Sequence, residues 1–317
     1  MHIIKATDPI AVEHPVFCWF GQPGIGKSSL GYSTTDPLLL DFDSGAHRAS
    51  HRRDTLLIAT WADVNDLMAS STALDPYRTI VVDTVGRCLD LLTADIIEQS
   101  PKYARDGNLT QQGWGVLKVR FRTWMTQLRT LGKDVALIAH QKEDKDGDTT
   151  IVRPDITGGS FGEVMKTADF VGFVYMRGKD RVIDFNPTDR WLGKNPAGWK
   201  PLLIPPVEKA SAFMADLFVQ GRAALGSISD ASAKVAQQVY EWREQIDTFT
   251  TVEEVNRAIS PIQKLPAVAA PQVKKLLMDR ARFLQLLWDP TLTRGDEKGG
   301  FKEPTNARPT AVAQAIA

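Results

Sequence analysis

The sequence contains 317 residues, of which 43% are apolar and 24% are charged, and its formal net charge is zero. This length and apolar content predict one large core and a smaller second unit, whereas the zero net charge excludes a uniformly basic surface. Two cysteines exclude a disulfide framework, and the apolar runs are too short for a membrane helix of about 18 residues. We therefore expect a cytoplasmic protein without a membrane partner.

The first predicted element is a buried strand over residues 16–20 that leads through a glycine-rich turn into a helix. The turn reads GQPGIGKS, which matches the phosphate-binding pattern G-x-x-x-x-G-K-[ST] at all eight positions. The glycines let successive backbone N–H groups point at an anion, so an ordinary glycine-rich turn is the weaker interpretation. The lysine is expected to reach the β- and γ-phosphates, and the serine hydroxyl to bind Mg²⁺. The predicted ATP site consists of Gly21, Gln22, Pro23, Gly24, Ile25, Gly26, Lys27, Ser28 and Ser29.

Three more short apolar runs follow, over residues 37–43, 56–59 and 79–84, with a helical pattern over residues 61–74 between the last two. Strands that alternate with helices predict an α/β fold in which a mostly parallel sheet is flanked by helices. Asp83 ends the apolar part of the third run, and a carboxylate at that place beside a phosphate-binding loop is expected to hold Mg²⁺ together with Ser28.

Asp43 ends the first of these runs and is a candidate for the base that activates the attacking water. Asp41 competes with it for this role. Both aspartates also suit a turn before Ser44 and Gly45, so function and turn formation remain open for each of them.

The remaining core elements alternate in the same way. Asp146 and Gly147 predict a hairpin tip, and Thr157 opens a further loop. Helices are predicted over residues 86–99, 114–131 and 161–166, and strands over residues 135–140, 170–175, 181–185 and 201–204.

The composition changes near residue 226, where a small helical unit is predicted to begin. Thr250 and Thr251 precede Glu253 and Glu254 at capping-box spacing. Asp289 and Pro290 are expected to close the last helix, and the charged, then Ala-, Pro- and Thr-rich end is expected to be disordered. The predicted domains are residues 1–225, 226–290 and 291–317.

The order of these motifs, with IAHQ at residues 138–141 and TGG at residues 157–159, resembles the core of RecA-like ATPases. Within this group the chain is most similar to the short phage single-strand-annealing ATPases of the Sak type, over about residues 14–205. The resemblance implies a RecA-like P-loop NTPase core that takes ATP and Mg²⁺. It also implies single-stranded DNA as a partner, a ring or filament of identical subunits, and the host cytoplasm as the location.

The resemblance also assigns roles to individual residues. Asp43 takes the position of the catalytic acid, where RecA-like proteins usually have glutamate, and His140 or Gln141 takes the position that senses the γ-phosphate. Residues 100–113 and 142–160 correspond to the two DNA-facing loops. The sequence GKNPAG resembles the KNRFG motif of RadA-type relatives, so Lys194 is a candidate for a lysine that reaches a neighbouring subunit's nucleotide, although an Asn-Pro turn explains it equally well.

DNA contacts are expected from basic residues in and beside these loops. Acidic residues lie among those of the second loop and would repel DNA, and surface helices carry such residues for solubility alone. Arg48, Arg52 and Arg53 form a second basic cluster. The DNA-binding candidates are Lys102, Arg105, Lys118, Arg122, Lys142 and Arg153.

These features favour an ATP-binding phage recombination protein that binds single-stranded DNA and promotes annealing or strand pairing, with DNA-dependent ATPase activity. The alternative is a nucleotide-gated adaptor or loader whose helical unit docks a single-strand-binding protein. A small-molecule kinase is disfavoured because the sequence has no arginine-rich lid segment.

Overall fold

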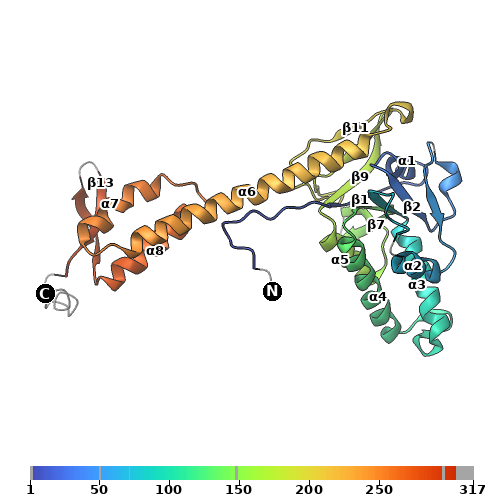
Figure 1. The fold of residues 1–317 in the computed structure, drawn as a ribbon, viewed down its shortest axis with the longest axis horizontal. Helices are drawn as coiled ribbons and strands as arrows, with labels where there is room; N and C mark the ends of the chain where they lie inside the picture. Colours follow the sequence, from blue (N-terminus) through green and yellow to red (C-terminus); the bar gives the residue numbers. More distant parts are fainter. Residues whose placement is uncertain (1–2, 50, 71, 147–148, 295–296, 305–317) are drawn as a thin grey trace. The chain divides into compact units, whose positions relative to one another are not determined.

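The structure is a computed structural model that describes residues 3–49, 51–70, 72–146, 149–294 and 297–304. It divides into two compact units, which we call the core unit (Val12–Leu225) and the C-terminal unit (Met1–Ala11 with Gly226–Ala317). Figure 1 shows the elements of both units. Residues 3–11 group with the C-terminal unit by their contacts.

A nine-stranded sheet lies at the centre of the core unit (Figure 1). Its strands are β1 (Val16–Gly21), β2 (Pro37–Asp41), β3 (Thr55–Leu57), β4 (Thr79–Asp83), β7 (Asp134–Asp146), β8 (Thr149–Pro154), β9 (Phe170–Arg177), β10 (Asp180–Asp184) and β11 (Leu202–Ile204). Their order is β11-β10-β9-β1-β7-β4-β2-β3, with β8 paired to β7. The pairings from β9 through β3 are parallel, and those of β8, β10 and β11 are antiparallel. The predicted α/β fold with a mostly parallel sheet is therefore confirmed.

Helices cover both faces of this sheet, which explains why β1 is apolar and buried at every position. The helices are α1 (Lys27–Tyr32), α2 (Trp61–Ala69), α3 (Val85–Gln99), α4 (Gln111–Thr130), α5 (Gly158–Thr167) and α6 (Phe213–Asp247). Cys18 and Phe20 of β1 pack in one cluster with side chains of α2, α3, α4 and α5. Phe17 and Trp19 face the other way and pack with side chains of α1 and the first part of α6.

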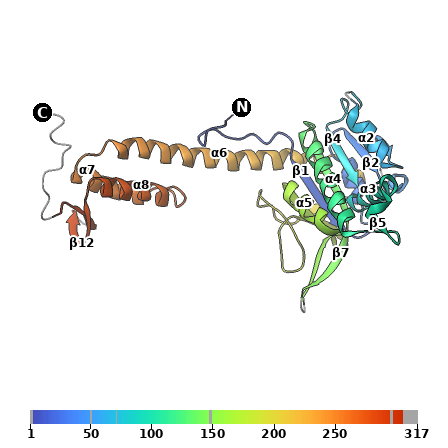
Figure 2. The same ribbon diagram turned by 90° about the horizontal axis from the view of Figure 1, so that it is seen from below.

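Two segments predicted as DNA-facing loops are more regular than expected. Residues 100–113 contain the turn η2 (Pro101–Tyr103) and the short hairpin β5 (Ala104–Arg105) and β6 (Asn108–Leu109) before α4 begins. The predicted loop over residues 142–160 is wrong, because Lys142 to Asp146 pair with Thr149 to Arg153 in an antiparallel hairpin. The hairpin predicted around Asp146 is confirmed, although residues 147–148 lie outside the described part. Figure 2 shows it projecting from the core unit.

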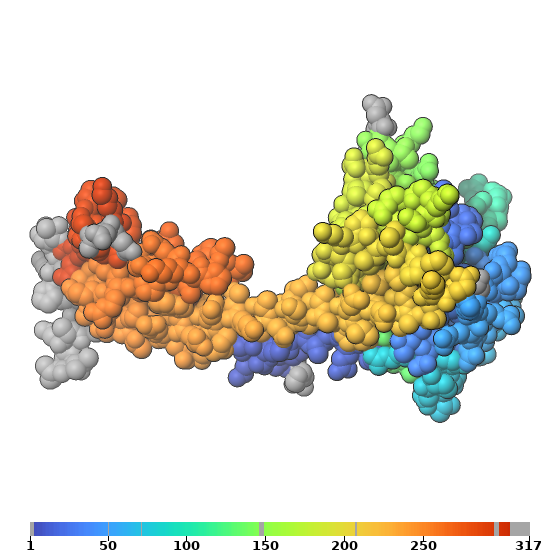
Figure 3. Space-filling model, turned by 90° about the horizontal axis from the view of Figure 1, so that it is seen from above, coloured from blue at the N-terminus to red at the C-terminus, as the bar shows by residue number. Residues whose placement is uncertain are grey.

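The C-terminal unit contains the later part of α6, α7 (Val252–Gln263), α8 (Ala270–Phe283), β12 (Leu287–Arg294) and β13 (Glu297–Lys302). The predicted capping box is confirmed, since Thr251 and Glu254 cap the start of α7 reciprocally. Within the same unit, residues 3–11 run beside α6, where the Ile10 amide donates to the Ser229 hydroxyl over 2.6 Å (Figure 3).

The chain after Leu287 forms a hairpin where the sequence predicts the end of a helix and then disorder. The rings of Trp288 and Phe301 meet edge to face with centroids 5.1 Å apart, and Phe301 is buried. Asn256 of α7 holds the hairpin from its side, because its amide donates to the Phe301 carbonyl and its carbonyl accepts from the Phe301 N–H. Two aromatic anchors therefore order this segment. Residues 305–317 of the predicted tail lie outside the described part.

Helix α6 begins 13 residues before the predicted domain boundary. It starts at Phe213, and Met214, Leu217 and Phe218 pack on the sheet. A Cβ at Gly221 would lie 2.8 Å from the Phe17 ring, so glycine is needed for this close approach. Among the described helices, none combines the length and apolar character needed to cross a membrane.

Candidate nucleotide-binding site

The phosphate-binding loop connects β1 to α1 and is closed around the Lys27 side chain. The Lys27 ammonium donates to the carbonyl oxygens of Gly21 (2.9 Å) and Gln22 (2.8 Å). Gly24 and Gly26 have φ values of 78° and 92°, which favour glycine, and Gly26 caps α1. The loop therefore holds its lysine in place through its own backbone, at the end of β1, one of the two middle strands of the sheet.

Lys27 is buried, with 5% of its surface exposed. Burial lowers the pKa of its ammonium to about 8, although the carboxylates of Asp83 and Asp43 oppose this effect. A phosphate group that entered the site would supply negative charge next to a cation that has lost most of its hydration.

Ser28 and Asp83 meet as predicted for a magnesium site. The Ser28 hydroxyl donates to Oδ2 of Asp83 over 2.5 Å. Burial raises the pKa of Asp83 to about 6, the Ser28 hydrogen bond opposes the rise, and the nearby Asp43 adds to it. The described residues contain no group of three or more His, Cys, Asp or Glu side chains placed for a metal ion. Mg²⁺ usually takes only one or two protein oxygens beside waters and phosphates, so this pair fits it.

Asp41 and Asp43, which the sequence left as competitors, differ clearly in the structure. Both carboxylate oxygens of Asp41 accept backbone N–H groups, from Asp43 (3.1 Å), Gly45 (3.0 Å) and Ala46 (2.8 Å). Asp41 is buried and shapes the turn after β2. Asp43 instead faces the cavity described below, where its carboxylate can accept a proton from water. The geometry favours Asp43 for the role of base.

His140 lies between the phosphate-binding loop and Asp83 because β7 separates β1 from β4. In register, His140 pairs with Gly21, and Ile138 pairs with Asp83. The Nε2 atom of His140 is 3.6 Å from Oδ2 of Asp43. Its Nδ1 atom and Oε1 of Gln141 are buried and have no hydrogen-bond partner among the described residues. His140 also lines the cavities described below, so its side chain lies at the predicted sensor position with one ring nitrogen unpaired.

Two adjoining cavities open over this cluster. The first, of about 390 Å³, is bordered by the loop, Lys27, Ser28 and Asp83, and the second has about 620 Å³. Both are lined by Pro23, Asp43, Arg48, Thr84 and His140. The combined space is of the size that small-molecule sites usually have.

Three arginines near this site were not recognised as part of it from the sequence. Arg48 lines both cavities. Arg87, in the first turn of α3, has its Nε 3.7 Å from Asp43 and donates to Asp90. Arg181 of β10 donates to the carbonyls of Ile25 (3.4 Å) and Pro205 (3.0 Å), and so supports the phosphate-binding loop from a strand far away in sequence. From the sequence, Arg48 belongs only to the basic cluster, and no motif points to Arg87 or Arg181.

Lys194 does not lie at its own chain's nucleotide site. It forms a bridge with Val171, near the start of β9, and its ammonium donates to the Ala168 carbonyl over 2.6 Å. The loop lies beside the later part of β9, where Gly21 pairs with Val174. A contact of Lys194 with a neighbouring subunit's nucleotide stays a prediction.

The DNA-binding candidates are spread over several elements. Lys102, Arg105, Lys118, Arg122 and Lys142 are exposed. Arg153 differs from them, because its guanidinium pairs with Asp144, donates to the Pro154 carbonyl and lies over the Phe161 ring. Its charge and donors are used within the fold, so we no longer expect Arg153 to bind DNA phosphate.

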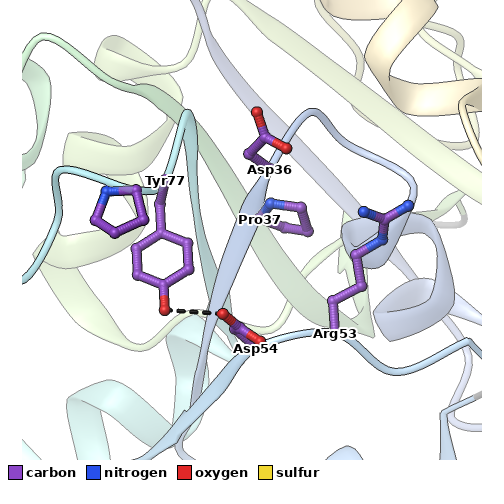
Figure 4. Close-up of a pocket in the computed structure, with 6 residues that line it drawn as sticks. Asp36, Pro37, Arg53, Asp54 and Tyr77 are labelled. Carbon is purple, nitrogen blue, oxygen red and sulfur yellow. Dashed lines mark hydrogen bonds between the residues drawn. The ribbon is translucent and has the colours of Figure 1, made fainter.

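A further pocket of about 280 Å³ lies at the start of β2, at the opposite end of the strand from Asp41. Figure 4 shows Asp36, Pro37 and Arg53 around it, with the Tyr77 hydroxyl donating to Asp54 over 2.9 Å. Arg53 and Arg48, grouped as one basic cluster from the sequence, therefore line different pockets.

Comparison with known proteins agrees with this geometry. The family AAA_24, described as an AAA domain, matches residues 13–197, which include β1, the loop, Asp83 and His140. A comparison with curated proteins gives no match. Since the family match covers more than half of the chain and contains the whole phosphate-binding site, the protein belongs to this AAA domain family and is a P-loop ATPase.

Proposed function

We propose that the protein is an ATP-dependent recombination protein that binds single-stranded DNA and promotes annealing or strand pairing, as the phage Sak-type ATPases it resembles do. It would bind ATP with Mg²⁺, act in the host cytoplasm, and assemble as a ring or filament of identical subunits. Mg²⁺ bound between Ser28 and Asp83 would neutralise phosphate charge. Asp43 would take the proton of the attacking water.

The main support for this proposal is that one strand, β7, runs from the nucleotide site into the projecting hairpin. The residues of β7 up to His140 lie within the sheet, and residues 141–146 form one strand of the projecting hairpin. The His140 carbonyl accepts the N–H of Asp155 over 2.8 Å, just after the second strand of the hairpin. A shift of His140 when the γ-phosphate binds or leaves would therefore act directly on both strands of the hairpin. This is the kind of connection that lets a nucleotide bias the binding of a second ligand.

The test measures ATP hydrolysis with and without a single-stranded oligonucleotide, together with the annealing of two complementary oligonucleotides. The wild-type protein should hydrolyse ATP faster with DNA and should anneal faster with ATP. His140→Ala should still bind ATP but lose the stimulation by DNA, whereas Lys27→Ala should lose ATP binding itself. Absence of DNA binding and of annealing, with ATP still bound, would refute the proposal.

The DNA surface is tested separately with the double variant Lys118→Ala and Arg122→Ala on α4. Loss of two phosphate contacts should weaken oligonucleotide binding and reduce the slope of log affinity against log salt by about 1.4. Arg153→Ala is the matched comparison, and we expect the slope to stay unchanged because Asp144 already neutralises Arg153.

A second function, as an adaptor that docks a single-strand-binding protein, is favoured by one observation. The C-terminal unit has its own buried core, and Phe283, Leu287 and Trp288 of this unit are all about half exposed or more. In this case the double variant Phe283→Ala and Leu287→Ala should lose binding to purified single-strand-binding protein while DNA affinity survives.

A further inference from the structure

We propose that Arg48 is the arginine that binds the γ-phosphate of the nucleotide within its own chain. This assignment rests on the proposed function only in taking a nucleoside triphosphate as the ligand. The sequence suggests Lys194 of a neighbouring subunit as a second cation at the nucleotide. Arg48 already lines the cavity in its own chain and can take that role.

The backbone that presents Arg48 is held firmly. Arg48 ends a single 3-10 turn, η1 (Ala46–Arg48), that follows the turn after β2. Asp41 fixes the start of this segment by accepting three backbone N–H groups, and Ala46 is buried. The N–H of Arg48 donates to the Gly45 carbonyl over 3.0 Å. The guanidinium therefore extends from a rigid base, as a positioning role requires.

Arg48 lies on the side of the cavity where the γ-phosphate is expected. The first cavity places it together with Lys27 and Ser28, which are expected to bind phosphate and metal, and the second places it with Thr84 and Arg87. Both cavities contain Asp43, the residue proposed to activate water. A γ-phosphate between Lys27 and Asp43 would lie within the space that Arg48 borders.

The charge of Arg48 is free to act on a ligand. Within the described part of the chain, its guanidinium forms no ion pair, whereas Arg87 is engaged with Asp43 and Asp90. Of the residues that line the first cavity, only Lys27 and Arg48 are lysine or arginine, and Arg48 is the one whose charge does not depend on pH in the ordinary range. A triphosphate keeps a net negative charge even with one Mg²⁺ bound, and two carboxylates already line the cavity, so a further cation beside Lys27 would stabilise the complex. Arginine suits this role since its planar donors match phosphate oxygens in pairs.

Gly45 leaves the space that the guanidinium occupies. A Cβ at residue 45 would lie 2.6 Å from Nη2 of Arg48 and 3.6 Å from Cβ of Asp43. Gly45 has a φ of −102°, which alanine adopts without strain, so the clash falls on the mobile end of a flexible side chain. Gly45→Ala is therefore expected to fold normally and to displace the guanidinium without removing its charge.

During hydrolysis the water oxygen bonds to the γ-phosphorus while the bond to the β–γ bridging oxygen breaks. The water proton passes to Asp43, and ADP and inorganic phosphate leave. Arg48 would bind the γ-phosphate oxygens as charge moves over them, a contribution worth about 10³–10⁵ in kcat for arginines in this role.

The test compares Arg48→Ala, Arg48→Lys and Gly45→Ala with the wild-type protein, measuring kcat, KM and the affinities for ATP and ADP. Arg177→Ala is the matched control, because Arg177 is an exposed arginine at the end of β9 that lines neither cavity. Arg48→Ala should lower kcat at least about a hundredfold and reduce the preference for ATP over ADP at least about tenfold, with ADP affinity changed less than about threefold. Arg48→Lys should recover part of the loss, Gly45→Ala should show a smaller loss, and the control should match the wild type.

Two results would overturn the assignment. One is an Arg48→Ala variant whose kcat and ATP preference stay within about threefold of wild type. The other is recovery of activity on mixing Arg48→Ala with Lys27→Ala subunits, because that would mean that Arg48 acts on a neighbour. If the wild-type protein hydrolyses no ATP, the ATP-hydrolysis part of the proposed function is wrong. The Arg48 assignment is then tested only by the preference of Arg48→Ala for ATP over ADP.

Discussion

The buried carboxylate of Asp83 should destabilise the protein when no nucleotide is bound. Burial raises its pKa from an ordinary value of 3.8 to about 6, so the folded protein resists ionising this group more than the unfolded chain does. Because the folded-state pKa is the higher one, the cost is absent below the unfolded-state pKa, grows as the pH rises, and is complete above the folded-state pKa. From the difference between the two pKa values, ionisation of Asp83 lowers the free energy of unfolding by about 3 kcal/mol at pH 8 and by about half of that at pH 5.

Asp83→Asn removes this cost and keeps an oxygen that can accept from Ser28. The nucleotide-free variant should therefore unfold at a higher urea concentration than wild type, with a gain in the free energy of unfolding of up to about 3 kcal/mol at pH 8 and a smaller gain at pH 5. The same variant should lose Mg²⁺-dependent hydrolysis. Asp41→Asn is the matched comparison: it weakens three backbone hydrogen bonds and should cost about 1–3 kcal/mol. If Asp83→Asn lowers stability at pH 8 by as much as Asp41→Asn does, the burial argument is wrong.

Three further predictions concern the loop and Lys194. Since burial lowers the pKa of Lys27 to about 8, the empty site loses its ammonium charge as the pH rises through that value. ATP affinity should therefore fall about tenfold between pH 7 and pH 9. An ATP affinity that does not change over this range would contradict the prediction. A Cβ at Gly21 would clash with the Val174 carbonyl oxygen, so Gly21→Ala should lower the melting temperature by an amount equivalent to about 1–3 kcal/mol, whereas Gly115→Ala, with open space around it, should not. Lys194→Ala should leave the nucleotide affinity of isolated subunits unchanged, because its ammonium lies on the Ala168 carbonyl, and a loss restricted to assembled protein would support the cross-subunit contact.

The sequence predicted those parts of the site that local chain geometry determines. Gly24, Gly26 and Lys27 lie within one turn, so their spacing alone requires the observed loop. Asp83 and His140 each follow a buried strand, and parallel strands bring their carboxyl ends to one edge of a sheet. The distinction between Asp41 and Asp43 needed the structure, because it depends on which carboxylate the following N–H groups reach.

Contacts between distant segments were beyond the sequence pattern. Arg181 reaches the phosphate-binding loop only because β10 lies two strands from β1. The sequence around Arg181 does not predict this strand order. The C-terminal hairpin was missed because Trp288 and Phe301 are far apart in a polar segment. Gly299, with a φ of 86°, leaves room for the Trp288 ring, since a Cβ there would lie 2.7 Å from it. The charged residues of this segment predicted disorder, whereas packing of the Trp288 and Phe301 rings stabilises a hairpin.

Several energetically unfavourable features of the core unit would be offset by the binding of one ligand. Lys27 is a cation held away from water, Asp83 is a carboxylate held away from water, and the imidazole of His140 has a ring nitrogen without a partner among the described residues. Each would be a cost in a purely structural protein. Mg²⁺ would neutralise Asp83, the phosphates would neutralise Lys27 and Arg48, and γ-phosphate oxygens would accept from the imidazole. A single triphosphate–metal complex removes all of these costs together, whereas a nucleotide without its γ-phosphate leaves those at His140 and Arg48. For this reason the site is expected to distinguish ATP from ADP, and β7 is the strand through which that difference would reach the hairpin.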